Sequence, residues 1–259
     1  MNKDINIVVV NDDGWGAQGI MLLTKLMTQL GHVTVVAPDG PRSSMSNAIS
    51  LGKPMTMDKV DIAQNDYFTE EEKRLIDVYV TNGMPSDCVK LALNVLFDDD
   101  PNRIDLLVSG INHGSNASVN VVYSGTMGAC FTGVEHGIRS IGLSIYDNNQ
   151  PTDLSQFEPY VVELCRHLLN DMDWKWGMCY NINAPLGEIS GIKWTRQCRG
   201  HWEKEIVPKI NGEGKTEYWM KGNFVNEEPE AEDTDEWAVH HGFISVQPCT
   251  VDMTEYAAL

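Results

Sequence analysis

The sequence predicts an α/β protein with a Rossmann-like, three-layer and mostly parallel sheet, followed by a strand-rich C-terminal extension for oligomerisation. Three observations support this fold class. Residues 7–10 are β-branched throughout, as in a parallel strand that is buried on both faces. A helical segment and a second apolar run follow at once, which makes a βαβ unit. Beyond Pro185, helical periodicity fades and strand-like pieces alternate with turns.

The remaining elements follow from apolar periodicity and from helix stop and start signals. A helix is expected over residues 20–30, because the apolar spacing fits and Gly31 is a typical stop. Strands are expected at 33–37, 78–81, 104–108, 141–145, 179–182, 192–195, 217–220 and 243–246, with further helices after Pro85, after Ser124 and over 153–170. A soft boundary near 186 divides a Rossmann-like domain, 1–185, from an oligomerisation segment, 186–259.

Composition excludes several classes of partner. The net charge of −18 argues against a partner that is a nucleic-acid polymer, because phosphate backbones require a surplus of Lys and Arg. No apolar run approaches the roughly 18 residues of a membrane span, so no membrane partner is expected. The first residues lack the pattern of a secretory signal, and the six cysteines are scattered. We therefore expect reduced thiols and a cytoplasmic protein.

Two adjacent carboxylates, Asp12 and Asp13, follow the first strand directly. The polar loops 39–47 and 109–116 follow two other predicted strands, and the carboxyl ends of parallel strands share one edge of a sheet. Adjacent anions repel unless a cation or proton lies between them. Carboxylate, hydroxyl and amide oxygens suit Mg²⁺ or Mn²⁺ rather than zinc. Each loop taken alone also fits an ordinary turn.

A possible anion site lies at Ser124, Gly125 and Thr126, where a helix is expected to begin. Free backbone N–H groups at a helix start bind phosphate oxygens. A metal on one side and this helix start on the other would clamp a phosphoryl group, and a neighbouring carboxylate could take a proton from water. The residues therefore predict hydrolysis of a phosphate ester.

One alternative is a dinucleotide (NAD-type) binding protein that performs no hydrolysis. Gly14, Gly16 and Gly19 match G-x-G-x-x-G between a strand and a helix. The objection is electrostatic, because Asp12 and Asp13 stand where an anionic pyrophosphate would settle.

Two further alternatives use other features of the chain. An aspartyl-phosphate phosphatase would use Asp12 or Asp13 as its nucleophile, but that chemistry usually shows Asp-x-Asp after the strand. A non-catalytic assembly protein would rely on the C-terminal aromatic residues and on the acidic run 227–233, which is expected to be an exposed loop.

Five blocks along the chain resemble, in order, the motifs of the SurE survival-protein family of 5′-nucleotidases. The blocks are 11–14 with 19–20, 35–39 with 42–43, 85–89, 108–112 with Gly114 and Asn116, and 123–126. The resemblance implies one divalent metal ion, Mg²⁺ or Mn²⁺, bound by Asp12, Asp13, Ser43 and Asn112. It also implies that Asn116, Ser124, Gly125 and Thr126 lie near the phosphate.

The same resemblance implies an activity and an assembly. The activity is hydrolysis of nucleoside 5′-monophosphates in a catalytic domain with Asp12 and Asp13 at its centre, often extending to 3′-nucleotides and short polyphosphate. The assembly is a homodimer or homotetramer that exchanges C-terminal segments. Trp194, Trp202 and Trp219 would then be buried against a partner, unless they fill the core of their own chain.

Several positions depart from the family pattern. Trp15 and Gly16 stand where the family often has Ile or Val and then His, while His113 and Ser115 alter the loop after Asn112. Segments 65–76 and 227–236 lengthen the chain. The predicted metal ligands are intact, so these departures concern substrate preference and assembly.

Four residues in the C-terminal segment complete the set of predictions. Asp235 is a further candidate site residue, because its surroundings are similar to the family's Thr-Asp block. His201, His240 and His241 are expected at the surface or in an interface rather than in catalysis.

Overall fold

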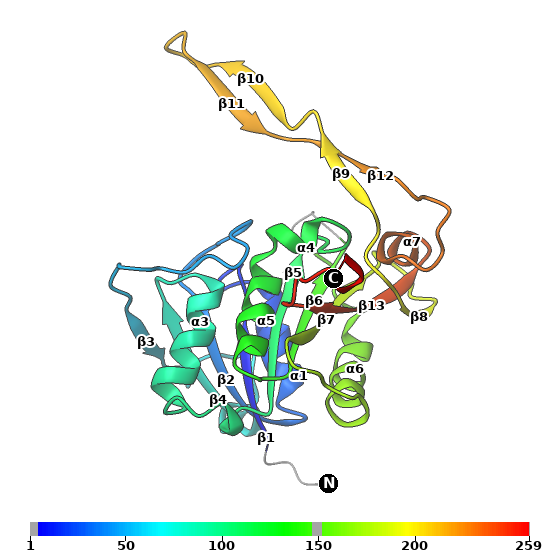
Figure 1. Ribbon diagram of the computed structural model, residues 1–259. Coiled ribbons are helices and arrows are strands. Elements are labelled where there is room, and N and C mark those ends of the chain that lie inside the picture. Colours follow the sequence, from blue (N-terminus) through cyan, green and yellow to red (C-terminus); the bar gives the residue numbers. More distant parts are fainter. Residues whose placement is uncertain (1–4, 147–151, 259) are drawn as a thin grey trace.

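The computed structural model describes residues 5–146 and 152–258, and these form one nine-stranded sheet with helices on both faces (Figure 1). In sheet order the strands are β3 (Met57–Val60), β4 (Ile76–Thr81), β2 (Gly31–Pro38), β1 (Ile5–Val10), β5 (Leu106–His113), β6 (Ser140–Ile145), β7 (Met178–Ala184), β13 (Phe243–Thr250) and β8 (Gly191–Trp194). The six strands from β4 to β7 run parallel, whereas β3 and β13 are antiparallel to their neighbours β4 and β7. This arrangement confirms the predicted Rossmann-like class.

Helices cover the sheet in two layers, one on each face. The first strand, β1, therefore has helices packed on both of its sides. Ile7 and Val9 pack into a cluster shared with α1 (Gln18–Met27) and α6 (Glu158–Asp171). Val8 and Val10 pack on the opposite face. The helices of that second face are α3 (Pro85–Leu91), continued by a π-helical turn at Ala92–Leu96, and α5 (Gly125–Glu135). Apolar side chains on both faces of β1 are therefore required by its central position.

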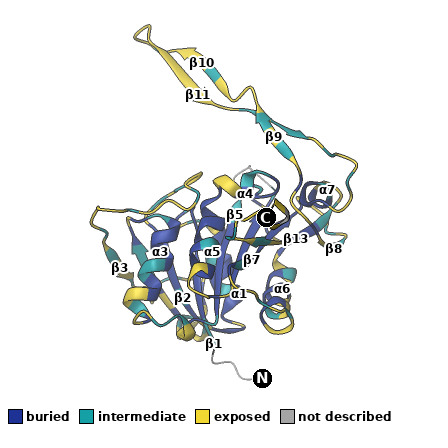
Figure 2. Cartoon of the chain, viewed as in Figure 1, coloured by how far each residue is buried: buried dark blue, intermediate teal, exposed yellow. Residues whose placement is uncertain are grey.

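The C-terminal segment contributes both to the sheet and to a projecting arm. β13 and β8 continue the main sheet beyond β7. The arm is formed by β9 (Gly200–Glu203) paired with β12 (Asn223–Asn226), and by β10 (Ile206–Ile210) paired with β11 (Thr216–Met220). It rises away from the body, and its outer half is largely exposed (Figures 1 and 2).

Several short elements complete the chain, and two charged segments lie among them. These elements are α2 (Glu70–Lys73), α4 (Asn120–Tyr123), α7 (Asp235–His240), and single 3₁₀ turns at Pro101–Arg103 and Tyr256–Ala258. In segment 65–76 Thr69 caps α2, and the charged side chains are exposed or half-buried, whereas Phe68 and Ile76 are buried. The acidic run 227–233 is an exposed or half-buried loop, as expected, and just beyond it Asp235 and Glu236 are buried and begin α7.

All six cysteines are free thiols, and all but Cys249 are buried. Among the helices of residues 5–146 and 152–258, none is long and apolar enough to cross a membrane.

Candidate active site

The candidate site lies where the winding of the sheet reverses direction. From β1 the chain passes outward to β2 and β4 on one side, and to β5, β6 and β7 on the other. Loops that leave neighbouring strands in opposite directions open a crevice at the carboxyl edge of the sheet. Here that crevice is a cavity of about 560 Å³, and Asp12, Asp13, Ser43 and Asn112 all line it. The structure thus brings the four predicted metal ligands together from three strand ends.

Asp12 is buried and fixed in place by the start of α5. The Thr126 hydroxyl donates a 2.7 Å hydrogen bond to Asp12 Oδ1. A Cβ atom at Gly125 would lie 2.9 Å from Asp12 Oδ2, so only glycine allows this approach without a shift. Burial raises the pKa of Asp12 to about 6, and the charge of Asp13 adds to the rise while the Thr126 bond opposes it. The two aspartates therefore gain from a nearby cation.

Asp13 and Asn112 each present an oxygen without a partner in the chain. Asp13 Oδ2 is buried and accepts no hydrogen bond. Burial raises the pKa of Asp13, and the neighbouring His113 opposes that rise. The Asn112 amide nitrogen donates to the Gly114 carbonyl at 2.8 Å, which leaves its Oδ1 as the free atom. Uncompensated buried oxygens of this kind suit a hard divalent cation.

Among the described residues, no group of three or more His, Cys, Asp and Glu side chains has the arrangement of a metal site. The predicted set of two carboxylates, a hydroxyl and an amide oxygen contains only two side chains of these types.

The predicted phosphate-binding residues surround the start of α5. Ser124 is the N-cap, and its hydroxyl accepts a 3.1 Å hydrogen bond from the Met127 N–H. Gly125 and Thr126 are the first helical residues, so their N–H groups have no carbonyl partner within the helix. The Thr126 side chain is turned to Asp12, not to the cavity.

Asn116 also lines the cavity, and its orientation is fixed by hydrogen bonds from two neighbouring strands. Its amide nitrogen donates to the Ser144 hydroxyl at 2.8 Å, and its backbone N–H donates to Asn183 Oδ1 at 2.8 Å. Asn116 and Ser124 therefore face the cavity from β5–β6 and from α5, as a phosphate site would require.

The opposite wall of the cavity comes from the base of the arm. Trp202 and Phe224 line it with ring centroids 5.8 Å apart in an edge-to-face arrangement. The Trp202 indole N–H donates to Asn120 Oδ1 at 2.9 Å, which ties the arm to α4. Trp202 thus packs within its own chain, whereas Trp194 and Trp219 are each 50% exposed.

Several residues that line the cavity were not singled out from the sequence as site residues, among them Tyr146, Phe224 and Glu236. No spacing signal connects them to the acid pair, because the connection depends on how the arm folds back over the sheet.

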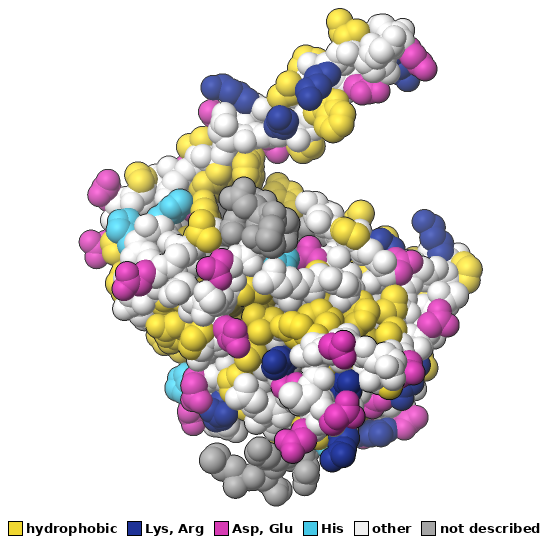
Figure 3. Space-filling view, turned by 180° about the vertical axis from the view of Figure 1, so that it is seen from behind, with side chains coloured by type: hydrophobic (Ala, Val, Ile, Leu, Met, Phe, Trp, Pro, Cys, Tyr) yellow, Lys and Arg dark blue, Asp and Glu magenta, His cyan; other side chains and the backbone are white. Residues whose placement is uncertain are grey.

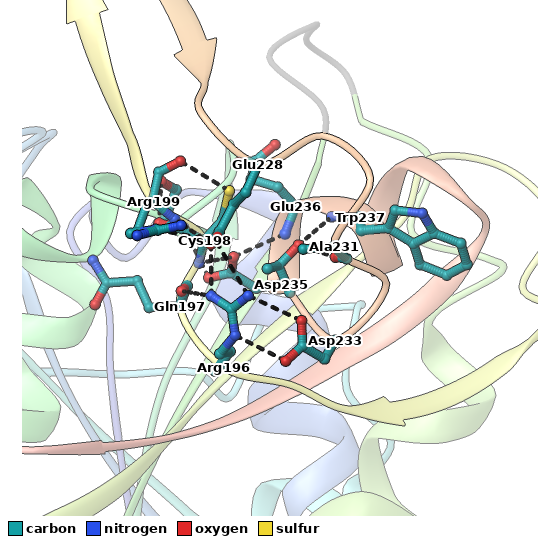
Figure 4. Close-up of polar contacts among 12 residues, drawn as sticks. Arg196, Gln197, Cys198, Arg199, Glu228, Ala231, Asp233, Asp235, Glu236 and Trp237 are labelled. Atoms are coloured by element: carbon teal, nitrogen blue, oxygen red, sulfur yellow. Dashed lines mark hydrogen bonds and ion pairs between the residues drawn. The ribbon is translucent and has the colours of Figure 1, made fainter.

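A network of ion pairs holds the segment that leads to this wall (Figure 4). Arg196 pairs with Asp233 at 2.9 Å and with Glu228 at 2.6 Å. Asp235 lies beneath this network, and its carboxylate accepts N–H bonds from Ser118 and Cys198. Asp235 therefore holds backbone and does not line the cavity, whereas the next residue, Glu236, does.

The three C-terminal histidines are exposed, as the sequence predicts. His201 pairs with Glu227, His241 stacks on Trp237, and His240 contacts the Tyr146 hydroxyl at 3.3 Å.

The glycine pattern of the dinucleotide alternative has another structural cause. A Cβ atom at Gly19 would lie 2.0 Å from the Ile111 carbonyl oxygen, so Gly19 permits α1 to pack closely on β5. Gly14 has φ +93° in the turn beside Gly40. Gly16 has open space around it, and none of the three glycines of the pattern lines the cavity.

Comparison with known proteins gives consistent results. The model of the family described as survival protein SurE matches residues 7–204. A protein named 5′-nucleotidase SurE from Flavobacterium psychrophilum is 40% identical, over 100% of this chain and 96% of its own. One of the same name from Phocaeicola vulgatus is 38% identical, over 98% and 93%. The crystal structure of the SurE protein from Aquifex aeolicus has a TM-score of 0.80 at 30% identity, covering 98% of this chain and 96% of that one.

Proposed function

This chain belongs to the survival protein SurE family, and on that premise we propose that it hydrolyses nucleoside 5′-monophosphates to nucleoside and phosphate in a metal-dependent reaction. The enzyme is accordingly a 5′-nucleotidase, a phosphoric monoester hydrolase. The observation that carries the metal dependence is the buried Oδ2 of Asp13, which has no hydrogen-bond partner and belongs to a carboxylate next to the buried Asp12.

Asp12, Asp13, Ser43 and Asn112 would hold the metal, and their oxygens fit Mg²⁺ or Mn²⁺. A divalent ion bound there supplies positive charge against the phosphate and lowers the pKa of water. The Thr126 hydroxyl keeps the Asp12 carboxylate in one orientation. A carboxylate oxygen of the Asp12–Asp13 pair that does not hold the metal would accept a proton from the attacking water.

The phosphate would bind between the acid pair and the start of α5. The N–H groups of Gly125 and Thr126 and the amide of Asn116 are the donors available to its oxygens. We extend the proposal to 3′-nucleotides and short polyphosphate, because these donors contact only the phosphoryl group. The dinucleotide alternative is not favoured, since the glycines serve packing and the cavity opens on carboxylates.

We also propose that the enzyme is a homodimer or homotetramer assembled through the arm. The arm carries exposed apolar side chains that its own chain does not cover, namely Ile206, Ile210, Tyr218, Trp219 and Met220. Figure 3 shows hydrophobic side chains along the arm, interspersed with basic and acidic ones. Apolar surface on so thin an element is stabilised only when another surface covers it.

The test of the proposed function is phosphate release from AMP and GMP with Mn²⁺ or Mg²⁺, before and after EDTA. We expect release that stops with EDTA and returns when the metal is added back. Asp12→Asn should lower kcat at least about a hundredfold and weaken Mn²⁺ binding, because it removes a charged ligand. Asp39→Asn is the matched control, since the Asp39 side chain is 52% exposed and pairs with Arg42 instead. Full activity of Asp12→Asn, or activity that EDTA does not change, would contradict the proposal.

A further inference from the structure

The cavity has two chemically different ends. One end holds the oxygens of Asp12 and Asp13, beside the start of α5. The other is lined by the arm-base aromatics Trp202 and Phe224, by Tyr146, by the charged arm residues Glu205 and Lys221, and by Glu236. The second end has no part in the proposed phosphate chemistry, and Glu205 is exposed whereas Glu236 is buried, so the Glu236 carboxyl group needs a separate explanation.

Glu236 is an incompletely paired acid in a buried position. Its side chain is 2% exposed, and its Oε2 is buried with no hydrogen-bond partner. His240 Nε2 lies 3.3 Å from this oxygen without hydrogen-bond geometry, and the same nitrogen contacts the Tyr146 hydroxyl at 3.3 Å. A buried carboxyl oxygen left without a partner destabilises the folded chain. A hydrogen bond from a ligand in the cavity would compensate for this.

The chain does not need Glu236 for its own architecture. The preceding residue, Asp235, already accepts N–H bonds from Ser118, from Cys198 and from Glu236 itself, and so joins α7 to the arm base. Because Asp235 holds the backbone, the Glu236 side chain can face the cavity.

We propose that Glu236 is a specificity-determining residue that binds the nucleoside half of the substrate, through a hydrogen bond between its Oε2 and a ribose hydroxyl or a base N–H group. This inference rests on the proposed nucleotidase function and concerns the far end of the same cavity. The aromatic residues Trp202 and Phe224 beside it offer faces and edges that suit a planar base.

The charge of Glu236 favours the same orientation of substrate. A carboxylate at Glu236 repels a phosphate, whereas the metal and helix start at the other end attract it. Burial, with the charge of Asp235, raises the pKa of Glu236 to about 7. Near neutral pH the group can therefore accept a hydrogen bond as a carboxylate or donate one as an acid.

The experiment compares kcat/KM for AMP with kcat/KM for p-nitrophenyl phosphate, which lacks a nucleoside, in the wild-type enzyme and in Glu236→Gln. We expect the ratio of the two values to fall about tenfold in the variant, the usual effect of one lost hydrogen bond to substrate. Binding of adenosine, measured by calorimetry without metal, should weaken by a similar factor. Glu203→Gln is the matched control: Glu203 is on β9, its side chain is 44% exposed and it does not line the cavity.

Substrate analogues identify the group that Glu236 contacts. If it is a ribose hydroxyl, 2′-deoxy- or 3′-deoxy-AMP loses activity in the wild type but loses no more in Glu236→Gln. If it is a base N–H group, the preference for GMP over AMP changes in the variant while the deoxy analogues behave alike in both proteins. Either result supports the proposal.

Two results would overturn it in distinguishable ways. An active wild type with an unchanged AMP to p-nitrophenyl phosphate ratio and unchanged adenosine binding in Glu236→Gln refutes the role of Glu236 alone. A wild-type enzyme that releases no phosphate from any nucleotide refutes the proposed function itself. Circular dichroism and thermal unfolding of each variant establish that it is folded.

Discussion

At the scale of single residues, the cavity is marked by acids that are buried without full compensation. Asp12, Asp13 and Glu236 each have a pKa that burial raises. Ordinary surface acids of this chain are paired or solvated instead, as Glu228 shows: hydrogen bonds from Arg196 lower its pKa to about 2. Raised pKa values grouped around one cavity distinguish a binding site from an acidic surface.

Glu236→Gln should change the dependence of stability on pH. The pKa of Glu236 rises from 4.5 to about 7 on folding, so the folded state binds the proton more tightly. Wild-type stability is then highest below pH 4.5, declines as the pH rises through 7 and levels off above it. The loss is on the order of 3 kcal/mol, at about 1.4 kcal/mol per pKa unit. Glutamine carries no charge, so the Glu236→Gln variant does not lose this stability as the pH rises.

Thermal unfolding in EDTA at pH 4 to 8 measures this effect. Relative to the wild type, the melting temperature of the variant should rise by roughly 5 °C or more between pH 4 and pH 8. Four other titratable groups face Glu236, namely Asp235, His240, Tyr146 and Cys198. They are present in both proteins, so the difference between the two curves isolates Glu236. A constant difference across the range would show that the Glu236 pKa is not raised.

Residue identity alone predicted one half of the cavity but not the other. Asp12, Asp13 and Asn112 were predictable because each ends or follows an apolar run, and strand ends of a parallel sheet must meet. Glu236 was not, because it lies just beyond the acidic run 227–233, and a count of charges does not distinguish a buried acid from the exposed acids before it. A count of charges cannot show that the Asp235 carboxylate accepts hydrogen bonds from three backbone N–H groups. These bonds hold the start of α7 in a buried position.

At the scale of elements, the site depends on how closely α5 approaches the end of β1. Gly125 is the first residue of α5, and its Cα hydrogen faces the Asp12 side chain. The helix start thereby brings its N–H groups close to the carboxylate of Asp12, the proposed metal ligand. The G-x-G-x-x-G pattern was ambiguous in the sequence because the role of Gly19 depends on a close contact with the Ile111 carbonyl, which is distant along the chain.

Gly125→Ala and Gly16→Ala form a matched pair for this element. A Cβ atom at Gly125 would lie 2.9 Å from Asp12 Cβ, so α5 or Asp12 must shift. We expect kcat for AMP to fall roughly a hundredfold, because displacement of about 1 Å at a reacting centre has effects of that size. At Gly16 a Cβ atom has nothing within 4 Å, and activity should stay near wild type. Equal loss in both variants would contradict the proposed geometry and would revive the glycine-loop alternative.

At the scale of the whole molecule, the arm projects from the body, which does not cover its outer half. The mostly parallel sheet follows from the alternation of apolar runs and helical segments, and the sequence predicted it. Strand-like patterns at 192–195, 217–220 and 243–246 were also predictable. Their destinations were not: β8 and β13 join the main sheet, whereas β11 projects on the arm. A period-2 pattern indicates a strand but does not identify the strand beside it.

Charging the arm should dissociate the proposed oligomer. Tyr218 and Trp219 are 70% and 50% exposed, and in an assembly these side chains would be covered. The double variant Tyr218→Lys with Trp219→Lys should elute as a monomer, and light scattering gives its mass. Lys215→Glu, in the turn before β11, is the control for charge and should remain assembled. An unchanged mass for the double variant would place the interface elsewhere.

The hydrogen bond from Trp202 to Asn120 lies between two parts of the cavity that would have different roles. Residues that would handle phosphate come from the sheet edge and α5, while the roof of the cavity comes from the arm base. The family model ends at residue 204, just inside the arm. Substitutions in the arm base should therefore change the roof of the cavity and leave the phosphate-handling residues in place. We expect exchange of the arm base between two enzymes of the family to exchange their substrate preferences while phosphate release continues.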